Sequence, residues 1–176
     1  MATSDSIVIK KIRFKYIMEI QYLKKLKKNS KIGSQKIIGV TENEIQKVEK
    51  KFNIIFPKAY REFLLLAGKY IGNLPLYDTA NLEDLAADWH QEIMWEVLES
   101  TNAKKDIKHP FWMFAESNGC EQFAFFYLED GEDPIVHTVD YGWEEYTVEI
   151  KSSKKTFSQY IDGRIDSAYH ILKHGW

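Results

Sequence analysis

The chain has 176 residues, of which 44% are hydrophobic and 28% charged, an ordinary composition for a globular protein. Because domains usually hold about 100–200 residues, we expect one domain with room for a short extension. The aromatic content of 14% favours a well-packed core or an aromatic contact surface. This composition excludes intrinsic disorder, a collagen-like chain and a pure coiled coil.

The net charge of −2 conceals a separation of charge along the chain. Residues 1–60 carry 14 Lys and Arg against 5 Asp and Glu, whereas residues 61–176 carry 10 against 21. Residues 72–102 and 111–150 contain neither Lys nor Arg. Such a separation creates a directional electric field that can steer a charged partner.

The cellular compartment is indicated by cysteine usage and by the N-terminal sequence. The single cysteine, Cys120, excludes an intramolecular disulfide, argues against a cysteine-based metal site and fits a reducing compartment. The apolar run Ile7–Ile9 is short and precedes lysines, the reverse of the order in a secretory signal. The longest later apolar run, Phe63–Ala67, is far too short to cross a membrane. We therefore expect a soluble, cytoplasmic protein without membrane partners.

The N-terminal part is basic, with ten Lys and Arg in residues 1–36. Apolar residues recur at helical spacing and predict a helix over Tyr16–Lys28, while residues 7–15 fit either a helix or a strand. The polar segment Asn29–Lys36 is typical of a linker. The chain is accordingly divided into a basic extension with its linker, residues 1–36, and a domain, residues 37–176.

Three helices are predicted in the first half of the domain. Thr41 and Glu44 have the spacing of a capping box that starts the first helix. Pro57 opens the second helix and Gly68 ends it. The third is expected over Leu82–Glu99, with one acidic face. Its inward face is predicted to hold Leu82, Leu85, Trp89, Ile93 and Val97.

From Phe111 onward the apolar residues follow the period of strands. The second of four predicted strands is apolar on both faces, so we expect a central strand that is covered on both sides. Helices, then antiparallel strands, then a closing helix over Ser153–Leu172 indicate an α+β fold with a sheet of about four or more strands. The four predicted strands are Phe111–Ala115, Phe123–Leu128, Ile135–Val139 and Tyr146–Ile150.

Sequence motifs of common enzymes are missing. The chain has no glycine-rich nucleotide loop, no nucleophile elbow and no zinc-protease motif. His170 and His174 have the spacing of a metal pair, but no third ligand is suggested and a solvated helix end explains them better. Cys120 has no cationic neighbour in sequence that would activate it, so we expect an inert thiol. We predict a protein without catalytic residues, cofactors or bound metal.

An acidic segment that contains aromatic residues is the main indication of function. A solvated surface with Trp143 in the core would explain it, but acids around exposed aromatics are also typical of a surface that binds a basic protein. We favour the second interpretation. The candidate partner-binding residues are Glu116, Glu121, Asp130, Glu132, Asp133, Asp140, Tyr141, Trp143, Glu144 and Glu145.

The basic N-terminal arm is the one feature that could favour a nucleic acid as partner. The rest of the chain is acidic, however, and its field would repel phosphates. The arm is explained as well by a solvated helix face, or by packing against the acidic body of the same protein. We therefore expect a protein partner rather than a nucleic acid.

Residues 39–68 combine a capped helix, a short apolar link and the pattern P-x-x-[YF]-x-x-[FL]-[LF]. A strand, the segment Pro134–Val136 and a helix that begins at Thr156 and Phe157 follow in order. Over Ile37–Leu172 these features resemble SUKH-superfamily domains, the Smi/Knr-like proteins. The residues that carry the resemblance in the opening are Ile45, Glu49, Phe56, Pro57, Tyr60, Phe63 and Leu64.

The resemblance implies an α+β fold with a curved sheet backed by helices, and no catalytic residues. Many bacterial SUKH proteins resemble immunity proteins, which bind and neutralise a cognate toxin domain, often a nuclease or a deaminase. The resemblance therefore implies a non-enzymatic immunity protein, whose carboxylates would occupy the positions of substrate phosphates on a basic toxin. The alternative is a regulatory scaffold that recruits cellular partners, as the fungal regulators of cell-wall synthesis do.

Overall fold

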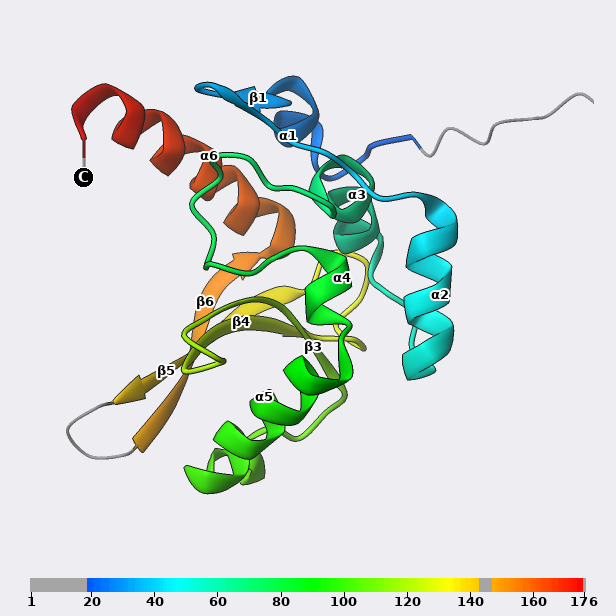
Figure 1. The fold of residues 1–176 in the computed structure, drawn as a ribbon, viewed down its shortest axis with the longest axis vertical. Coiled ribbons are helices and arrows are strands. Elements are labelled where there is room, and N and C mark those ends of the chain that lie inside the picture. Colours follow the sequence, from blue (N-terminus) through cyan, green and yellow to red (C-terminus); the bar gives the residue numbers. More distant parts are fainter. Residues whose placement is uncertain (1–18, 143–146, 176) are drawn as a thin grey trace, which may run out of the picture.

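A computed structural model describes residues 19–142 and 147–175 and has the α+β architecture expected from the sequence (Figure 1). Its centre is a four-stranded antiparallel sheet in which the strands are neighbours in the order β3-β4-β5-β6. Strand β4 is therefore central, as predicted. The strands are β3 (Phe111–Ser117), β4 (Gln122–Tyr127), β5 (Ile135–Gly142) and β6 (Thr147–Thr156).

One face of the sheet packs on helices α2 (Glu42–Phe52), α3 (Lys58–Ala67) and α6 (Phe157–His174). Aromatic rings fill the space between these layers. The Tyr60 ring of α3 lies 5.2 Å from the Phe126 ring of β4, measured between centroids, and 5.5 Å from that of Phe157 at the start of α6. Edge-to-face pairs of this kind add to the free energy gained by burying the rings.

The second face of the sheet is covered by α4 (Leu82–Leu85), α5 (Asp88–Ser100) and the short 3₁₀ helix η1 (Ala103–Asp106). Trp95 of α5 lies edge-on against Phe111, with ring centroids 5.4 Å apart, and Phe111 contacts Phe125 in the same way at 5.2 Å. All four residues of Phe123–Phe126 are buried. This confirms the prediction that the central strand is covered on both sides.

The predicted third helix is two helices, and its inward face differs from the expected one. The chain leaves the helical path after Leu85, and α5 begins only at Asp88. The interruption rotates the buried face by one position, so that His90 points inward and Trp89 is 54% exposed. The expectation of a buried Trp89 is therefore wrong, because it extended the helical spacing of Leu82 and Leu85 across the break between α4 and α5. The buried residues of α5 are His90, Met94 and Leu98.

Strand β6 extends to Thr156, and α6 begins four residues later than the predicted Ser153. The helix starts where Thr156 accepts a hydrogen bond from the backbone N–H of Gln159, while the Gln159 side chain accepts one from the backbone N–H of Thr156. This capping box fixes the boundary. None of the helices in residues 19–142 and 147–175 is both long and apolar enough to cross a membrane.

The N-terminal segment differs most from the sequence-based expectation. In place of a helix over Tyr16–Lys28, the described residues form only the short helix α1 (Lys24–Lys28). The expected linker contains a small hairpin, β1 (Lys31–Ile32) and β2 (Gln35–Lys36). Leu23, Leu26 and Ile32 are fully buried. The boundary at residue 36 stays a prediction, but residues 19–36 share the hydrophobic core of the domain.

A buried carboxylate explains why residues 19–23 are not helical. Glu62 of α3 is inaccessible to solvent, and its two oxygens accept hydrogen bonds from the backbone N–H groups of Gln21, Tyr22 and Leu23 at 2.8–2.9 Å. In the interior of a helix over Tyr16–Lys28 these N–H groups would bond to carbonyl oxygens four residues earlier, so their bonds to Glu62 are incompatible with that helix. Because a buried carboxylate is strongly destabilising without partners, the segment and Glu62 satisfy one another.

We predict that Glu62→Ala lowers the free energy of unfolding by at least about 3 kcal/mol, since each buried donor left without an acceptor costs about 1–3 kcal/mol. Urea denaturation followed by circular dichroism measures the loss. The control is Glu129→Ala at an exposed turn position, which should change stability by less than about 0.5 kcal/mol. Equal stability of the two variants would contradict the role given to Glu62.

Candidate functional site

The predicted acidic residues do not form one surface, because they lie at opposite ends of the sheet. In a meander of antiparallel strands, successive turns alternate between the two ends. Asp130, Glu132 and Asp133 lie in the β4–β5 turn at one end. Glu121, in the β3–β4 turn, and Asp140, which pairs with Gln122, lie at the other end together with the β5–β6 hairpin.

At the β4–β5 turn, two of the three carboxylates bind neighbouring parts of the chain. Glu132 accepts a hydrogen bond from the Tyr22 hydroxyl at 2.7 Å, and this contact raises the pKa of Tyr22 to about 12. Asp133 accepts hydrogen bonds from the backbone N–H of Ser158 at 2.8 Å and from its hydroxyl at 2.6 Å, and so caps the start of α6. Asp130 is exposed. Glu132 and Asp133 therefore join the β4–β5 turn to the N-terminal segment and to α6.

At the hairpin end, Asp140 is half-buried on β5 opposite Glu149 of β6, and Glu121 is half-buried in its turn. Tyr141 continues the backbone of β5. Trp143, Glu144 and Glu145 lie outside the described residues. Their assignment to a partner-binding surface stays a prediction.

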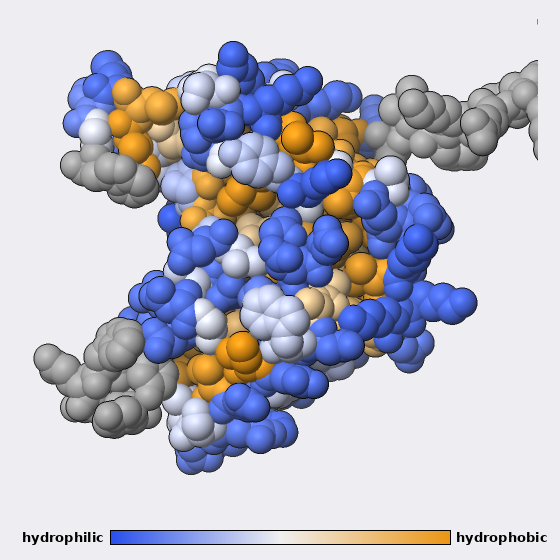
Figure 2. All heavy atoms as spheres, viewed as in Figure 1, coloured by the Kyte–Doolittle hydropathy of each residue, from blue (hydrophilic) through white to orange (hydrophobic). Residues whose placement is uncertain are grey.

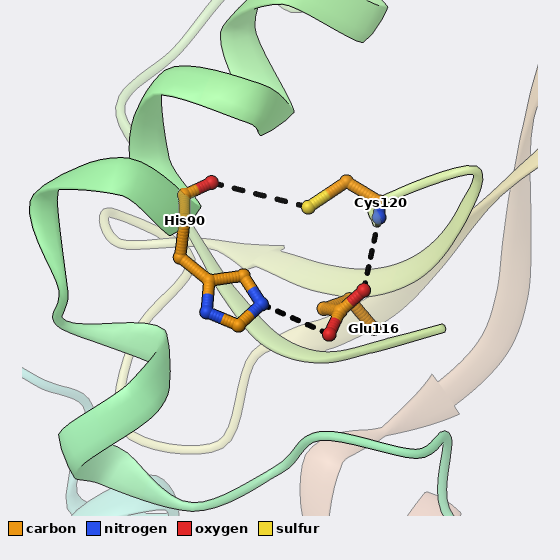
Figure 3. Close-up of side chains that lie close together, drawn as sticks. All are labelled: His90, Glu116 and Cys120. Atoms are coloured by element: carbon orange, nitrogen blue, oxygen red, sulfur yellow. Dashed lines mark hydrogen bonds and ion pairs between the residues drawn. The ribbon is translucent and has the colours of Figure 1, made fainter. Parts of the chain in front are cut away.

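The assignment of Glu116 to the surface needs correction. Its side chain is 5% exposed and lies between His90 of α5 and Cys120 of the β3–β4 turn (Figure 3). One carboxylate oxygen is 2.9 Å from Nε2 of His90, and the other accepts a hydrogen bond from the backbone N–H of Cys120 at 2.9 Å. The helix α5, which covers this face of the sheet, places the Glu116 side chain inside.

The His90–Glu116 contact contains one proton whose position determines the charges. Nδ1 of His90 lies 2.9 Å from the carbonyl oxygen of Asp84, which can only accept, so Nδ1 carries a hydrogen. A single proton between Nε2 and Glu116 then makes the pair either imidazolium with carboxylate or neutral imidazole with carboxylic acid. In both forms every polar atom of the pair has a partner, as buried groups require. The pair joins α5 to the sheet.

Cys120 completes a buried group of three potential metal ligands, whose donor atoms lie within 4.8 Å of one another. Its sulfur contacts the carbonyl oxygen of His90 at 3.9 Å and Sδ of Met113 at 3.8 Å. Burial, with a smaller contribution from Glu116, raises the pKa of the Cys120 thiol to about 12. Because a metal binds the thiolate, this environment favours a neutral thiol within a hydrogen-bonded cluster.

The exposed aromatic surface of α5 was not predicted from the sequence. Trp89 is 54% and Trp95 38% exposed. Trp95 also lines a groove of about 400 Å³ between α5, the end of α2 and the start of β3. The absence of Lys and Arg from residues 72–102 was the signal in the sequence that pointed to this region. The exposure of Trp89, however, results from the break in the helix after Leu85. The apolar lining of the groove includes Phe52, Ile54, Met94, Trp95, Pro110 and Phe111.

The N-terminal lysines and the acids of α5 lie at different ends of the molecule, although Lys51 and Lys104 lie beside α5 and pair with two of its acids. The lysine-bearing elements α1 and β1 lie at the upper end of Figure 1, whereas α5 and the β5–β6 hairpin lie at the lower end. Contacts of η1 with both α5 and β6 connect the end of α5 to the edge strand of the sheet. Over α5, the face seen in Figure 2 combines apolar and hydrophilic side chains. The lower end therefore offers an acidic surface that includes aromatic side chains.

The chain belongs to the SMI1 / KNR4 family (SUKH-1), whose family description matches residues 39–163. Family members are generally non-catalytic immunity or regulatory proteins, so the chain is a protein-interaction module of the SUKH type. No curated protein matches the chain significantly. The opening residues that carry the resemblance are largely interior: Ile45, Phe56, Tyr60, Phe63 and Leu64 are buried. They define the fold rather than a binding site.

We predict that Glu116→Ala lowers the free energy of unfolding by about 3–5 kcal/mol, because it leaves His90 and the Cys120 N–H without a buried partner. Glu116→Gln should cost less than half as much, since its amide can still accept from Cys120 and donate to a neutral imidazole. Chemical denaturation of the two variants measures the difference. A loss below about 1 kcal/mol for Glu116→Ala would mean that the cluster does not hold α5 to the sheet.

Proposed function

We propose that this protein is a cytoplasmic, non-enzymatic immunity protein that binds and neutralises a cognate, basic toxin domain. Membership of the SUKH-1 family over residues 39–163 is the observation that carries the proposal. The spatial separation of charge supports a basic partner, because an acidic end can steer such a partner and orient it before contact.

The proposed contact surface is the acidic end that contains the β5–β6 hairpin. Of the acids predicted from sequence, Glu121 and Asp140 lie at this end of the sheet, and Glu144 and Glu145 fall in the sequence between β5 and β6. Tyr141 and Trp143 would supply aromatic contacts. Asp130, Glu132 and Asp133 are weaker candidates, since two of them bind segments of the same chain.

Neutralisation requires no reaction in this proposal. A nuclease or deaminase toxin holds a nucleic acid through Lys and Arg side chains, and carboxylates can take the places of the phosphates on those cations. Occupation of that surface excludes the substrate of the toxin. The inhibitor then needs affinity and a matching charge pattern, and both are properties of its surface rather than of a catalytic group.

We predict that the adjacent upstream gene encodes a protein with a C-terminal toxin domain, and that co-expression of the chain rescues growth of cells that produce this domain. The purified pair should associate more than tenfold more slowly when the ionic strength rises from about 0.05 M to about 0.5 M, because salt screens exposed charges. Stopped-flow fluorescence measures this rate. Failure to bind or neutralise that domain would reject the immunity role and favour the regulatory alternative.

A separate prediction concerns the hairpin. Glu144→Gln combined with Glu145→Gln should weaken toxin binding without lowering the melting temperature, since exposed acids contribute little to stability. The matched control is Lys27→Gln combined with Lys28→Gln, two exposed positions on the basic end. Unchanged affinity of the well-folded Glu144/Glu145 variant would remove the hairpin from the contact surface.

A further inference from the structure

We propose that the outer face of α5 and the adjoining Trp95 groove form the main docking surface for the toxin, and that they receive a basic segment carrying an apolar side chain. The inference rests on the proposed function and specifies where and how the partner binds. It concerns residues 88–99 and the groove beside them.

The outer face of α5 has acids in the middle and tryptophans at its edges. With a turn of 100° per residue, Asp88, Glu92, Glu96 and Glu99 fall on one stripe along the helix. Trp95 flanks the stripe on one side and Trp89 on the other, and both rings are partly exposed. Lys104 shows this kind of contact within the chain, because it pairs with Glu99 and its Nζ lies 5.2 Å from the centroid of the Trp95 ring. A Lys or Arg of the partner can make the same contacts with Trp89 and the unpaired acids, or take the place of Lys104 on Trp95.

The two central acids of the stripe are available to a partner. Asp88 forms an ion pair with Lys51 at 2.8 Å, and Glu99 forms one with Lys104. Glu92 and Glu96 make no ion pair within residues 19–142 and 147–175. Their charges therefore remain for complementary contact with cations from another molecule.

The groove provides the apolar part of the surface. It opens beside Trp95, and its hydrophobic walls come from α2, α5 and the start of β3. Its volume of about 400 Å³ suits one large side chain and its neighbours. Aromatic anchors in such hollows dominate the binding energy of many interfaces, whereas charged residues around them set orientation and rate.

Two contacts hold α5 in place before a partner binds. His90 holds α5 to Glu116 of the sheet, and Lys51 Nζ donates to the carbonyl oxygen of Ala86 at 2.7 Å just before the helix begins. A helix fixed at its base loses little conformational entropy when a partner docks.

A basic partner fits this face better than a second copy of the chain. A two-fold symmetric contact places the same patch of each subunit against the other. Here it would set one acidic stripe against another, and like charges in contact disfavour association. Charge complementarity therefore selects a partner segment rich in Lys and Arg.

The test measures binding to an inactive form of the toxin domain encoded upstream. Trp95→Ala should raise the dissociation constant by about 30-fold or more, as loss of a central aromatic anchor does, chiefly through faster dissociation. Glu92→Gln combined with Glu96→Gln should slow association about tenfold at low salt and reduce its salt dependence. The Glu92/Glu96 variant should keep the native melting temperature, because these side chains are exposed. Trp95 also packs on Phe111, so the binding of Trp95→Ala is measured well below its own melting temperature, with circular dichroism showing that the variant is folded.

The matched control is Glu19→Gln combined with Asp166→Asn, which removes the same charge from two exposed positions that line neither α5 nor the groove. It should bind like the native chain. If the native chain binds the toxin and the α5 variants bind equally well, the docking surface is wrong and the immunity role stands. If the native chain does not bind, both fall. Self-association that Trp95→Ala abolishes in sedimentation experiments would identify a second copy as the occupant and overturn the inference.

Discussion

Strand β4 is apolar on both faces, and the arrangement of the other elements follows from the need to cover it twice. Phe126 meets the aromatic layer of α3 and α6, while Phe123 and Phe125 require cover on the opposite side. Helices α4 and α5 provide that cover, so their outer faces become a surface of the molecule. The position of the acidic face of α5 thus depends on the burial of apolar residues of β4 on the opposite side of the helix.

Two buried carboxylates fasten peripheral segments to this layered core. Glu62 accepts three backbone N–H groups from residues 21–23, and Glu116 joins His90 of α5 to the backbone of Cys120. In each case a charge is placed in the interior only where several donors converge, because an unpaired carboxylate there would be very unfavourable. Acidic residues in this chain therefore have two roles: interior ones hold segments in place, and exterior ones create the field that a partner meets.

The division of roles fits a SUKH-type interaction module. The family-defining residues, among them Tyr60 and Phe63, fill the interior and can be shared by proteins with different partners. Specificity must then come from surfaces attached to the core, such as the hairpin end and the outer face of α5. Both lie away from the lysine-bearing α1 and β1, which are at the opposite end of the molecule (Figure 1).

The sequence by itself determined the α+β class, the Thr41–Glu44 capping box, the central strand and the family, because these depend on local periodicity and on side chains that act within a few residues. It could not determine the path of residues 19–23, since their helical spacing was overridden by Glu62, 39–41 positions away. It also placed Trp89 inside and Glu116 outside. A two-residue break between α4 and α5 turns Trp89 outward and brings His90 onto Glu116. Only tertiary packing decides which residues of an element face the core. A shift of one residue changes which side chain is buried, while the composition stays the same.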